Sequence, residues 1–554
     1  MKRIVAVILA LMLSMMLAVG VSGCSSSSSS SSAGTSASAA KVTTEKYIVT
    51  EWSDSSGQEL ISWLGWLGVP LDTLSLELRS DGTMTWDNTM LDTALGNQPV
   101  VYEGTYKTSG SEYTLTFDGI SKAETMTVSG DKITWVMSGS RDKIVLQKTD
   151  PAAKPAYQDL KYDFYAVAAS VKPITYTKLL ENYALTAAER RMYDQLVEGI
   201  ANFEVEIEVD HFNPNDSADW LTMAKVEGIV YYTHPEFFWF RIGGFSAKPL
   251  ASGRYAVYPF YYMDNECVRA IPYNSGNVDY PPAEKVAELK AWVEKSKVEI
   301  DEALKKVPVY LGMTPFELEL AVHDWLCDIA DYQEAYASGG TIATATNIHG
   351  ALTKGKINCM GYSSTFQYIM NMLGVETVQM DSDMPNDDTG HTFNAIKLGG
   401  AWYYVDVTND DHIGELYNAP SVTGHYFLNC TEKFYADHIL TVYTPYDCNP
   451  NISCTSVTYY YYVVTNTLIA SDADLASSLP ARITRAYTHK EKGFDLLINP
   501  SYAKASAIGD KLVSFGVPKS GSLYTVGLDN GLTVKLRPYV DDARNAVLFV
   551  IDYS

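Results

Sequence analysis

The sequence predicts a multidomain α+β protein. An N-terminal antiparallel β-barrel or sandwich is followed by a central α+β domain and a small C-terminal α+β domain. The chain has 554 residues, more than one hydrophobic core accommodates. Its N-terminal part contains short alternating apolar runs separated by turn residues, and its middle mixes such runs with helical periodicity. The 39 tyrosines fit a chain rich in half-buried strands.

The N-terminus is typical of an export signal. A basic start, Lys2–Arg3, precedes the apolar run Ile4–Val21 and the small residues Ser22–Gly23, directly before Cys24. This order resembles the bacterial lipobox, which implies that Cys24 is acylated and anchors the protein to the cell membrane. A transmembrane anchor is the alternative. The serine run Ser25–Ser32 favours the lipobox, because such a run behaves as a flexible tether.

Composition divides the chain into six segments. They are the signal (1–24), the tether (25–40), a β domain (41–150), a mixed α/β lead-in region (157–311), the central domain (312–446) and a C-terminal α+β domain (451–554). No stretch after the signal is apolar enough to cross a membrane, so we expect an extracytoplasmic body. The net charge of −24 argues against a nucleic-acid partner, which would require a basic face.

Turn residues separate the expected elements of the β domain and of the flanking regions. The predicted N-terminal strands are Leu74–Arg79, Thr83–Trp86, Tyr113–Phe117, Thr125–Val128 and Ile133–Val136. With the phrase Gly104-Thr105-Tyr106, this spacing resembles the lipocalin-like domains of clostridial lipoproteins. The predicted helices of the lead-in region are Ala187–Phe203 and Pro282–Lys306. Further predicted strands are Phe237–Ile242, Tyr255–Tyr262, Val457–Val464, Thr533–Val540 and Ala546–Tyr553.

Cys359 is the candidate nucleophile. The apolar residues that follow it have helical spacing up to Leu373, and Gly374 is a natural C-terminal stop. Cys359 is therefore expected at a helix N-terminus, where unpaired N–H groups and the helix dipole favour a thiolate. The same N–H groups can stabilise an oxyanion.

A hairpin supplies two partners for this cysteine. Gly399–Gly400 predicts a two-residue turn that pairs Leu398 with Ala401. In this register His391 and Asp406 are diagonal neighbours on one face of the hairpin. Together with Cys359 they match a nucleophile, a base and an orienting carboxylate, which predicts attack on an amide carbonyl through a thioester.

These motifs resemble the transglutaminase-like superfamily, which has a papain-like α+β fold. They are Gly355 to Tyr362, His391 to Asn394 and Trp402 to Asp406, with a lead-in helix around Ala321 to Leu326 and trailing residues at His425 and His438. The resemblance covers about a quarter of the chain and implies the catalytic residues Cys359, His391 and Asp406. It marks His349, Tyr362 and Trp402 as cleft candidates, although His349 fits a hydrogen-bonded loop residue equally well. Three positions depart from the family pattern: Asn358, Phe393 and Asn409.

The remaining histidines, acidic residues, cysteines and tyrosines support less specific predictions. No histidine or cysteine spacing matches a zinc motif, so neither a metal nor another cofactor is predicted. The run Asp381–Asp388 is expected to be a solvated loop rather than a calcium site, since EF-hand spacing is absent. Cys327 is expected to be a buried thiol, and Cys448 with Cys454 could close a short disulfide loop. Tyr459–Tyr462 fits a packed strand better than a glycan-binding platform.

The sequence thus predicts a cell-surface lipoprotein whose cysteine enzyme domain acts on a protein or cell-wall peptide. Hydrolysis is favoured over cross-linking, because water is always available and no site for a second amine is evident. The alternative is a binding or adhesion lipoprotein that uses the same fold without catalysis.

Overall fold

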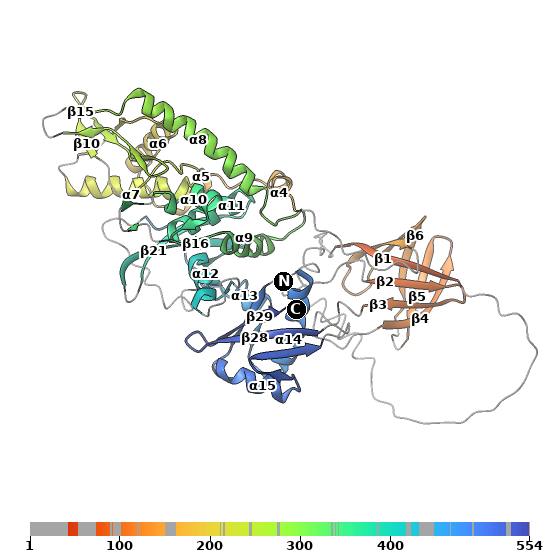
Figure 1. Cartoon of the computed structure of the whole chain (residues 1–554). Coiled ribbons are helices and arrows are strands. Elements are labelled where there is room, and N and C mark those ends of the chain that lie inside the picture. The colour runs from red at the N-terminus through yellow and green to blue at the C-terminus, as the bar shows by residue number, and fades with distance from the viewer. Residues whose placement is uncertain are drawn as a thin grey trace, which may run out of the picture. The chain divides into compact units, whose positions relative to one another are not determined.

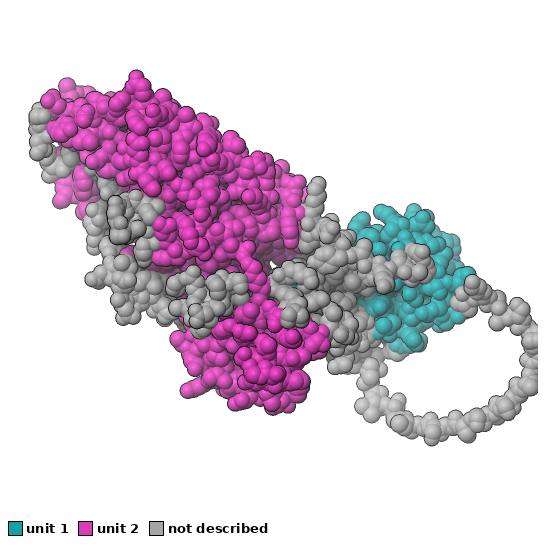
Figure 2. Space-filling model, viewed as in Figure 1, with its two compact units in different colours: residues 1–160, 472–491, 528–532 teal, residues 161–471, 492–527, 533–554 magenta. Residues whose placement is uncertain are grey.

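The computed structural model describes most of the chain after the Ser-rich segment. The described residues are 43–53, 74–88, 91, 101–118, 120, 122–149, 162–210, 212–213, 216–242, 246–273, 277–333, 336–337, 340–341, 343–384, 387–416, 423–431, 448–465, 467–489, 492–527 and 533–552. Their helices and strands are shown in Figure 1. They belong to two compact units (Figure 2): residues 1–160, 472–491 and 528–532, and residues 161–471, 492–527 and 533–554. Cys24 and His438 lie outside the described residues.

The first unit contains a closed antiparallel barrel of eight strands in sequential order. The strands are β1 Thr44–Ser53, β2 Ser75–Arg79, β3 Thr83–Asp87, β4 Val101–Ser109, β5 Glu112–Phe117, β6 Glu124–Ser129, β7 Lys132–Val136 and β8 Lys143–Thr149. Helix α14 (Asp472–His489) also belongs to this unit. Pairing of β1 with β8 closes the barrel, which confirms the predicted antiparallel β domain and selects the barrel over the sandwich.

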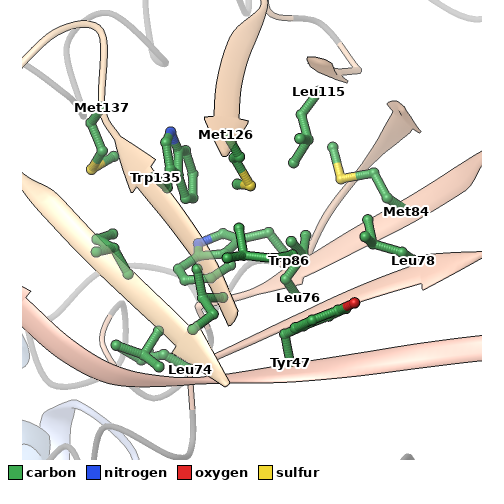
Figure 3. Close-up of a cluster of buried hydrophobic side chains, with 14 of the residues drawn as sticks. Tyr47, Leu74, Leu76, Leu78, Met84, Trp86, Leu115, Met126, Trp135 and Met137 are labelled. Atoms are coloured by element: carbon green, nitrogen blue, oxygen red, sulfur yellow. The ribbon is translucent and has the colours of Figure 1, made fainter. Parts of the chain in front are cut away.

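Side chains that alternate along the strands fill the barrel (Figure 3). Trp86 and Trp135 meet edge to face near the middle of this core, with ring centroids 5.4 Å apart. Gly104 lies where β4 approaches its neighbours most closely, because a Cβ there would sit 2.2 Å from the Thr116 carbonyl oxygen. The interior is thus a packed apolar core made by the alternation that the sequence shows.

The second unit begins with helices and short strands in the lead-in region. The helices are α4 Phe164–Ser170, α5 Tyr176–Leu179, α6 Ala187–Ala201, α7 Ser217–Thr233 and α8 Ala283–Leu304. The strands are β9 Ile207–Val209, β10 Ser246–Pro249, β11 Tyr255–Tyr258, β12 Tyr261–Met263, β13 Glu266–Val268, β14 Ile271–Pro272 and β15 Val278–Asp279. Helices α6 and α8 confirm two predictions. The strand predicted at Phe237–Ile242 is wrong, since this segment makes turns and only one bridge, from Phe240 to Tyr261.

The central part of the second unit packs helices against an antiparallel sheet. Its helices are α9 Pro315–Ile329, α10 Ile348–Lys354, α11 Cys359–Met372 and α12 Val407–Leu416. Its sheet runs in the order β20 Thr377–Met384, β21 Asp387–Leu398, β22 Ala401–Val405 and β23 Leu428–Cys430. Two small pairs accompany it, β16 Asp331–Tyr332 with β19 Lys356–Ile357, and β17 Tyr336–Ala337 with β18 Gly340–Thr341. Helix α11 packs on β20 and β21 and contacts α9, α10 and α12.

The C-terminal residues of this unit form a six-stranded sheet, β24-β25-β29-β28-β27-β26. The strands are β24 Leu468–Ile469, β25 Gly493–Ile498, β26 Lys519–Ser520, β27 Leu523–Gly527, β28 Thr533–Asp541 and β29 Ala546–Asp552, and α15 is Ile508–Ser514. Strands β28 and β29 confirm two predictions. The strand predicted at Val457–Val464 is wrong, because its last residues form the helical turn α13 (Tyr461–Val464).

Two alternatives that the sequence left open are decided in the second unit. Tyr460, Tyr461 and Tyr462 are buried, so this run offers no exposed platform for a glycan. The structure shows no disulfide among the six described cysteines, and the Cys448 thiol donates instead to the Lys225 carbonyl oxygen at 3.6 Å. Cys327 is buried, as predicted. No helix among the described residues is long and apolar enough to cross a membrane.

Candidate active site

Cys359 is the first residue of α11, as the sequence predicts. The preceding Asn358 is the N-cap, and its side-chain oxygen accepts the Gly361 N–H at 3.3 Å. The asparagine that departs from the family pattern therefore closes the helix end on which the thiol sits. The N–H groups of Cys359 and Met360 precede the first bond of the helical ladder, so they can donate to an oxyanion.

Close backbone packing explains why two positions of the motif are glycine. Gly355 ends α10 in the left-handed conformation, with φ of 63°, and a Cβ there would lie 2.5 Å from the Ile329 carbonyl oxygen. A Cβ on Gly361 would lie 2.6 Å from the Ala345 carbonyl oxygen and 2.6 Å from Ile357. Both positions exclude larger residues, which brings α10, α11 and the 3₁₀ turn Ala343–Thr346 close together behind the thiol.

The hairpin has the predicted register. Leu398 pairs with Ala401 and Asn394 pairs with Val405 across the turn at Gly399–Gly400. Both turn glycines have positive φ, as a type I′ turn requires. The pairing places His391 and Asp406 on one face, at the end of the hairpin remote from the turn.

His391 connects the other two candidate residues. Its Nε2 donates to Asp406 Oδ2 at 2.8 Å, and its ring also hydrogen-bonds the Cys359 side chain. Because Asp406 occupies Nε2, the nitrogen left for the thiol is Nδ1. Cys359 and His391 are each 8% exposed and Asp406 is 0% exposed, so water screens this chain of bonds weakly. The structure brings all three predicted residues together.

The charge state of His391 follows from these neighbours. Burial alone would lower the pKa of His391, but the charge and hydrogen bond of Asp406 and the hydrogen bond to Cys359 outweigh it and raise this pKa to about 10. At neutral pH both ring nitrogens therefore carry a proton, and the ring is a positively charged imidazolium. An imidazolium next to sulfur stabilises the thiolate, which is the nucleophilic form.

Asp406 is fixed from its other side by Asn409. The Asn409 N–H donates to Asp406 Oδ1 at 3.1 Å, and the Asn409 side-chain amide donates to Oδ2, the oxygen that also accepts from His391. Asp406 directly precedes α12, so it caps this helix while it holds the histidine. The second departure from the family pattern, Asn409, thus supports the carboxylate.

Polar bonds fix α11 against the sheet that carries His391. The Asn394 amide donates to the Ser363 carbonyl oxygen at 3.0 Å, and the Ser363 hydroxyl donates to Gln379 at 3.2 Å. The Gln367 amide donates to the Tyr232 carbonyl oxygen at 2.7 Å, which links α11 to α7. These buried bonds set the distance between the cysteine helix and the histidine strand. Phe393, the third departure, stacks parallel to the His391 ring at 6.3 Å.

Tyr231 on α7 is a site residue that the sequence did not indicate. Burial and, to a lesser extent, the nearby Cys359 raise its pKa to about 12, and its hydroxyl donates to the Thr346 carbonyl oxygen at 2.6 Å. The bond ties α7 to the 3₁₀ turn Ala343–Thr346, which contacts α11. No motif surrounds it, and α7 itself was not predicted.

The three cleft candidates lie in different surroundings. Tyr362 follows Cys359 by three residues on α11, is buried and donates its hydroxyl to Asp411 on α12. His349 packs between Phe238 and Trp292 and lies 3.4 Å from Glu299 on α8. That environment matches a hydrogen-bonded structural residue, but His349 lies in helix α10 and not in the loop that this alternative assumed.

Trp402 lies near the turn of the hairpin, four residues before Asp406. Lys397 lies over its ring, with the ammonium 5.2 Å from the ring centroid. Four residues of strand span roughly 13 Å, so Trp402 lies well along the strand from the carboxylate.

The described residues of the acidic run before His391 lie in strands and not in a loop. Asp381 and Ser382 belong to β20, and Asp381 pairs with Thr392 in the β20–β21 hairpin. The Asp381 carboxylate accepts the Tyr232 hydroxyl at 2.6 Å and the Thr392 hydroxyl at 3.3 Å. The predicted solvated loop is wrong because these partners satisfy the carboxylate within a strand.

Comparison with known proteins finds solved structures that are similar to part of this chain. No protein-family model and no curated protein matches the chain. A crystal structure of a TGase is 15% identical over 30% of this chain and 44% of that chain, with a TM-score of 0.18. A proposed cysteine protease from Cytophaga hutchinsonii is 13% identical over 30% of this chain and 61% of its own, with a TM-score of 0.16. The chain covers less than two thirds of either structure.

Proposed function

We propose that the protein is a lipid-anchored, extracytoplasmic cysteine enzyme of the transglutaminase-like type that acts on amide bonds in proteins or cell-wall peptides. The observation that supports this most strongly is the buried chain from Asp406 through His391 to Cys359. A protonated histidine held between a carboxylate and a thiol at a helix N-terminus is the arrangement that amide chemistry through sulfur requires.

The proposed reaction has two halves. The Cys359 thiolate attacks the amide carbonyl carbon, and the oxyanion receives hydrogen bonds from N–H groups at the start of α11. The His391 imidazolium then donates its proton to the leaving amine as the C–N bond breaks, which leaves a thioester. In the second half, neutral His391 takes a proton from water as the water oxygen attacks the thioester, which releases the acid and restores the Cys359 thiolate beside the His391 imidazolium.

Hydrolysis is the favoured outcome of the second half. An amine could replace water and would form a cross-link by the same steps. Water needs no binding site, whereas an amine substrate does. A dansyl-cadaverine assay with casein separates the two, because incorporation of the dye reports transfer and loss of intact casein reports hydrolysis.

The test is replacement of Cys359 by alanine. We expect both casein cleavage and dye incorporation to disappear in Cys359→Ala, while circular dichroism stays unchanged. Cys267→Ala is the matched control, since this thiol is exposed on β13, and its activity should equal that of the parent. Activity that survives in Cys359→Ala would exclude the proposed nucleophile. A parent without activity on protein and peptidoglycan-peptide substrates would favour the binding lipoprotein.

Membrane attachment through Cys24 is a separate part of the proposal. The parent expressed with its signal should partition into the detergent phase of a Triton X-114 extract. Cys24→Ala should lose lipid labelling by radioactive palmitate. Equal labelling of both proteins would contradict acylation at this residue.

A further inference from the structure

A second cluster of titratable side chains lies in the same unit and takes no part in the thioester chemistry. His323 and Asp324 come from α9, and His425 comes from the residues that precede β23. Asp324 Oδ1 lies 2.9 Å from His323 Nδ1 and 2.9 Å from His425 Nε2. The ligand atoms that the three residues offer all lie within 4.8 Å of one another. Two imidazole nitrogens thus hydrogen-bond the same carboxylate oxygen, and a bound cation would replace these ring N–H hydrogens.

The far nitrogen of each ring is held by a buried carboxylate. His323 Nε2 lies 3.2 Å from Asp410 Oδ2, and His425 Nδ1 lies 2.8 Å from Asp495 Oδ1. A histidine that binds a metal usually donates its other ring N–H to a carboxylate in this way, because the bond fixes the tautomer and the ring orientation. Both histidines here have that support.

The supporting carboxylates are themselves fixed. Asp410 accepts the Phe427 N–H at 3.0 Å, and Asp495 accepts the His425 N–H at 3.0 Å together with the Tyr462 hydroxyl. Their positions are set before any ion binds, so both rings already present one nitrogen to Asp324.

Charge and exposure also favour a cation. Three carboxylates, those of Asp324, Asp410 and Asp495, surround the two imidazole rings, whose centroids are 5.5 Å apart. The His323 side chain is 0% exposed and the His425 side chain 5%, whereas the Asp324 side chain is 44% exposed. An ion could enter past Asp324 and keep water in its remaining positions.

We propose that His323, Asp324 and His425 bind one divalent transition-metal ion of the Zn²⁺ class. Two imidazoles and one carboxylate suit Zn²⁺, Fe²⁺ or Co²⁺ and disfavour Ca²⁺, which prefers six or more oxygen ligands. The ion joins α9 to the segment before β23, and Asp495 extends the support to β25. Metal binding therefore stabilises the folded unit.

Titration of the chelator-treated full chain with Co²⁺ and Zn²⁺ tests this site. We expect one equivalent of Co²⁺ to bind with visible d–d absorption bands, and Zn²⁺ to displace it and to raise the melting temperature. In Asp324→Asn the affinity should fall at least about 10-fold, since even loss of a supporting contact typically costs 10- to 100-fold. Asp328→Asn is the matched control on the same helix, because its exposed carboxylate pairs with Lys492, and its affinity should be unchanged.

A second variant keeps the test decisive if Asp324→Asn does not fold. His425→Cys replaces one ligand with another, so its Co²⁺ complex should gain a thiolate charge-transfer band in the near ultraviolet that the parent lacks. Absence of stoichiometric Co²⁺ binding by the parent would overturn the proposal. So would equal affinity in Asp324→Asn and Asp328→Asn, or a His425→Cys complex whose spectrum equals that of the parent.

Discussion

Asp406→Asn is expected to slow modification of Cys359 by iodoacetamide at pH 6 about 10- to 100-fold, because hydrogen bonds to charged groups contribute roughly 1.5–3 kcal/mol. Asparagine can still accept the Asn409 N–H through its oxygen and cap α12. Its amide then faces His391 Nε2 and the Asn409 amide, which are both donors. His391 must give up its proton on Nε2, and the ring loses the charge that supports the thiolate.

The loss in amide turnover should be larger than the loss in alkylation rate. It should stay below the roughly 10⁴-fold cost of the same change in a serine triad, since a thiolate depends less on a base. Thermal melting measured on the same samples is the control. Unchanged melting with slow alkylation supports the triad. Lower stability with an unchanged alkylation rate would show that Asp406 serves only as the helix cap.

His391→Gln is expected to destabilise the protein by about 3–5 kcal/mol at pH 6, because it leaves the Asp406 carboxylate buried without its cationic partner. The pKa of His391 is raised from its ordinary 6.5 to about 10 in the folded protein. A raised histidine pKa contributes stability that is fully present below the unfolded pKa and is lost as pH rises through the folded pKa. The difference in unfolding free energy between the parent and His391→Gln should therefore shrink as the pH rises from 6.5 to 10.

Urea unfolding of both proteins at pH 6, 8 and 9.5 measures this difference. His349→Gln is the matched control. Burial, which outweighs the hydrogen bond to Glu299, lowers the pKa of His349 below its ordinary value, so its ring is neutral in both the folded and the unfolded protein at pH 8 and 9.5, and the difference in unfolding free energy should be the same at these two pH values. If the difference in unfolding free energy between the parent and His391→Gln were also independent of pH, His391 would not be held in its charged form.

Local sequence patterns predicted the parts of the site that depend on neighbouring residues. Gly399–Gly400 fixed the hairpin turn, and strand alternation then placed His391 beside Asp406. The helical spacing after Cys359 predicted the start of α11. The barrel was predicted for the same reason, since its inward residues alternate along each strand.

Features that depend on distant contacts were not predictable. Residues 226–234 are buried without interruption, so α7 has no polar face to reveal its period, and Tyr231 was missed with it. The tyrosine run before Val464 has strand propensity but is buried as a helical turn. His323 and His425 are far apart in the sequence, so no metal spacing connects them.

The most direct test of the central claim is a labelling competition within the unmodified protein. Brief treatment with limiting iodoacetamide at pH 5.5, followed by peptide mass spectrometry, compares Cys359, which is 8% exposed, with the exposed Cys267. Although Cys267 is exposed as a residue, partial desolvation of its sulfur by neighbouring atoms raises the pKa of the thiol, so it should react slowly. The triad predicts that Cys359 is labelled first and in excess. Labelling of Cys267 ahead of Cys359 would contradict an activated nucleophile at this site.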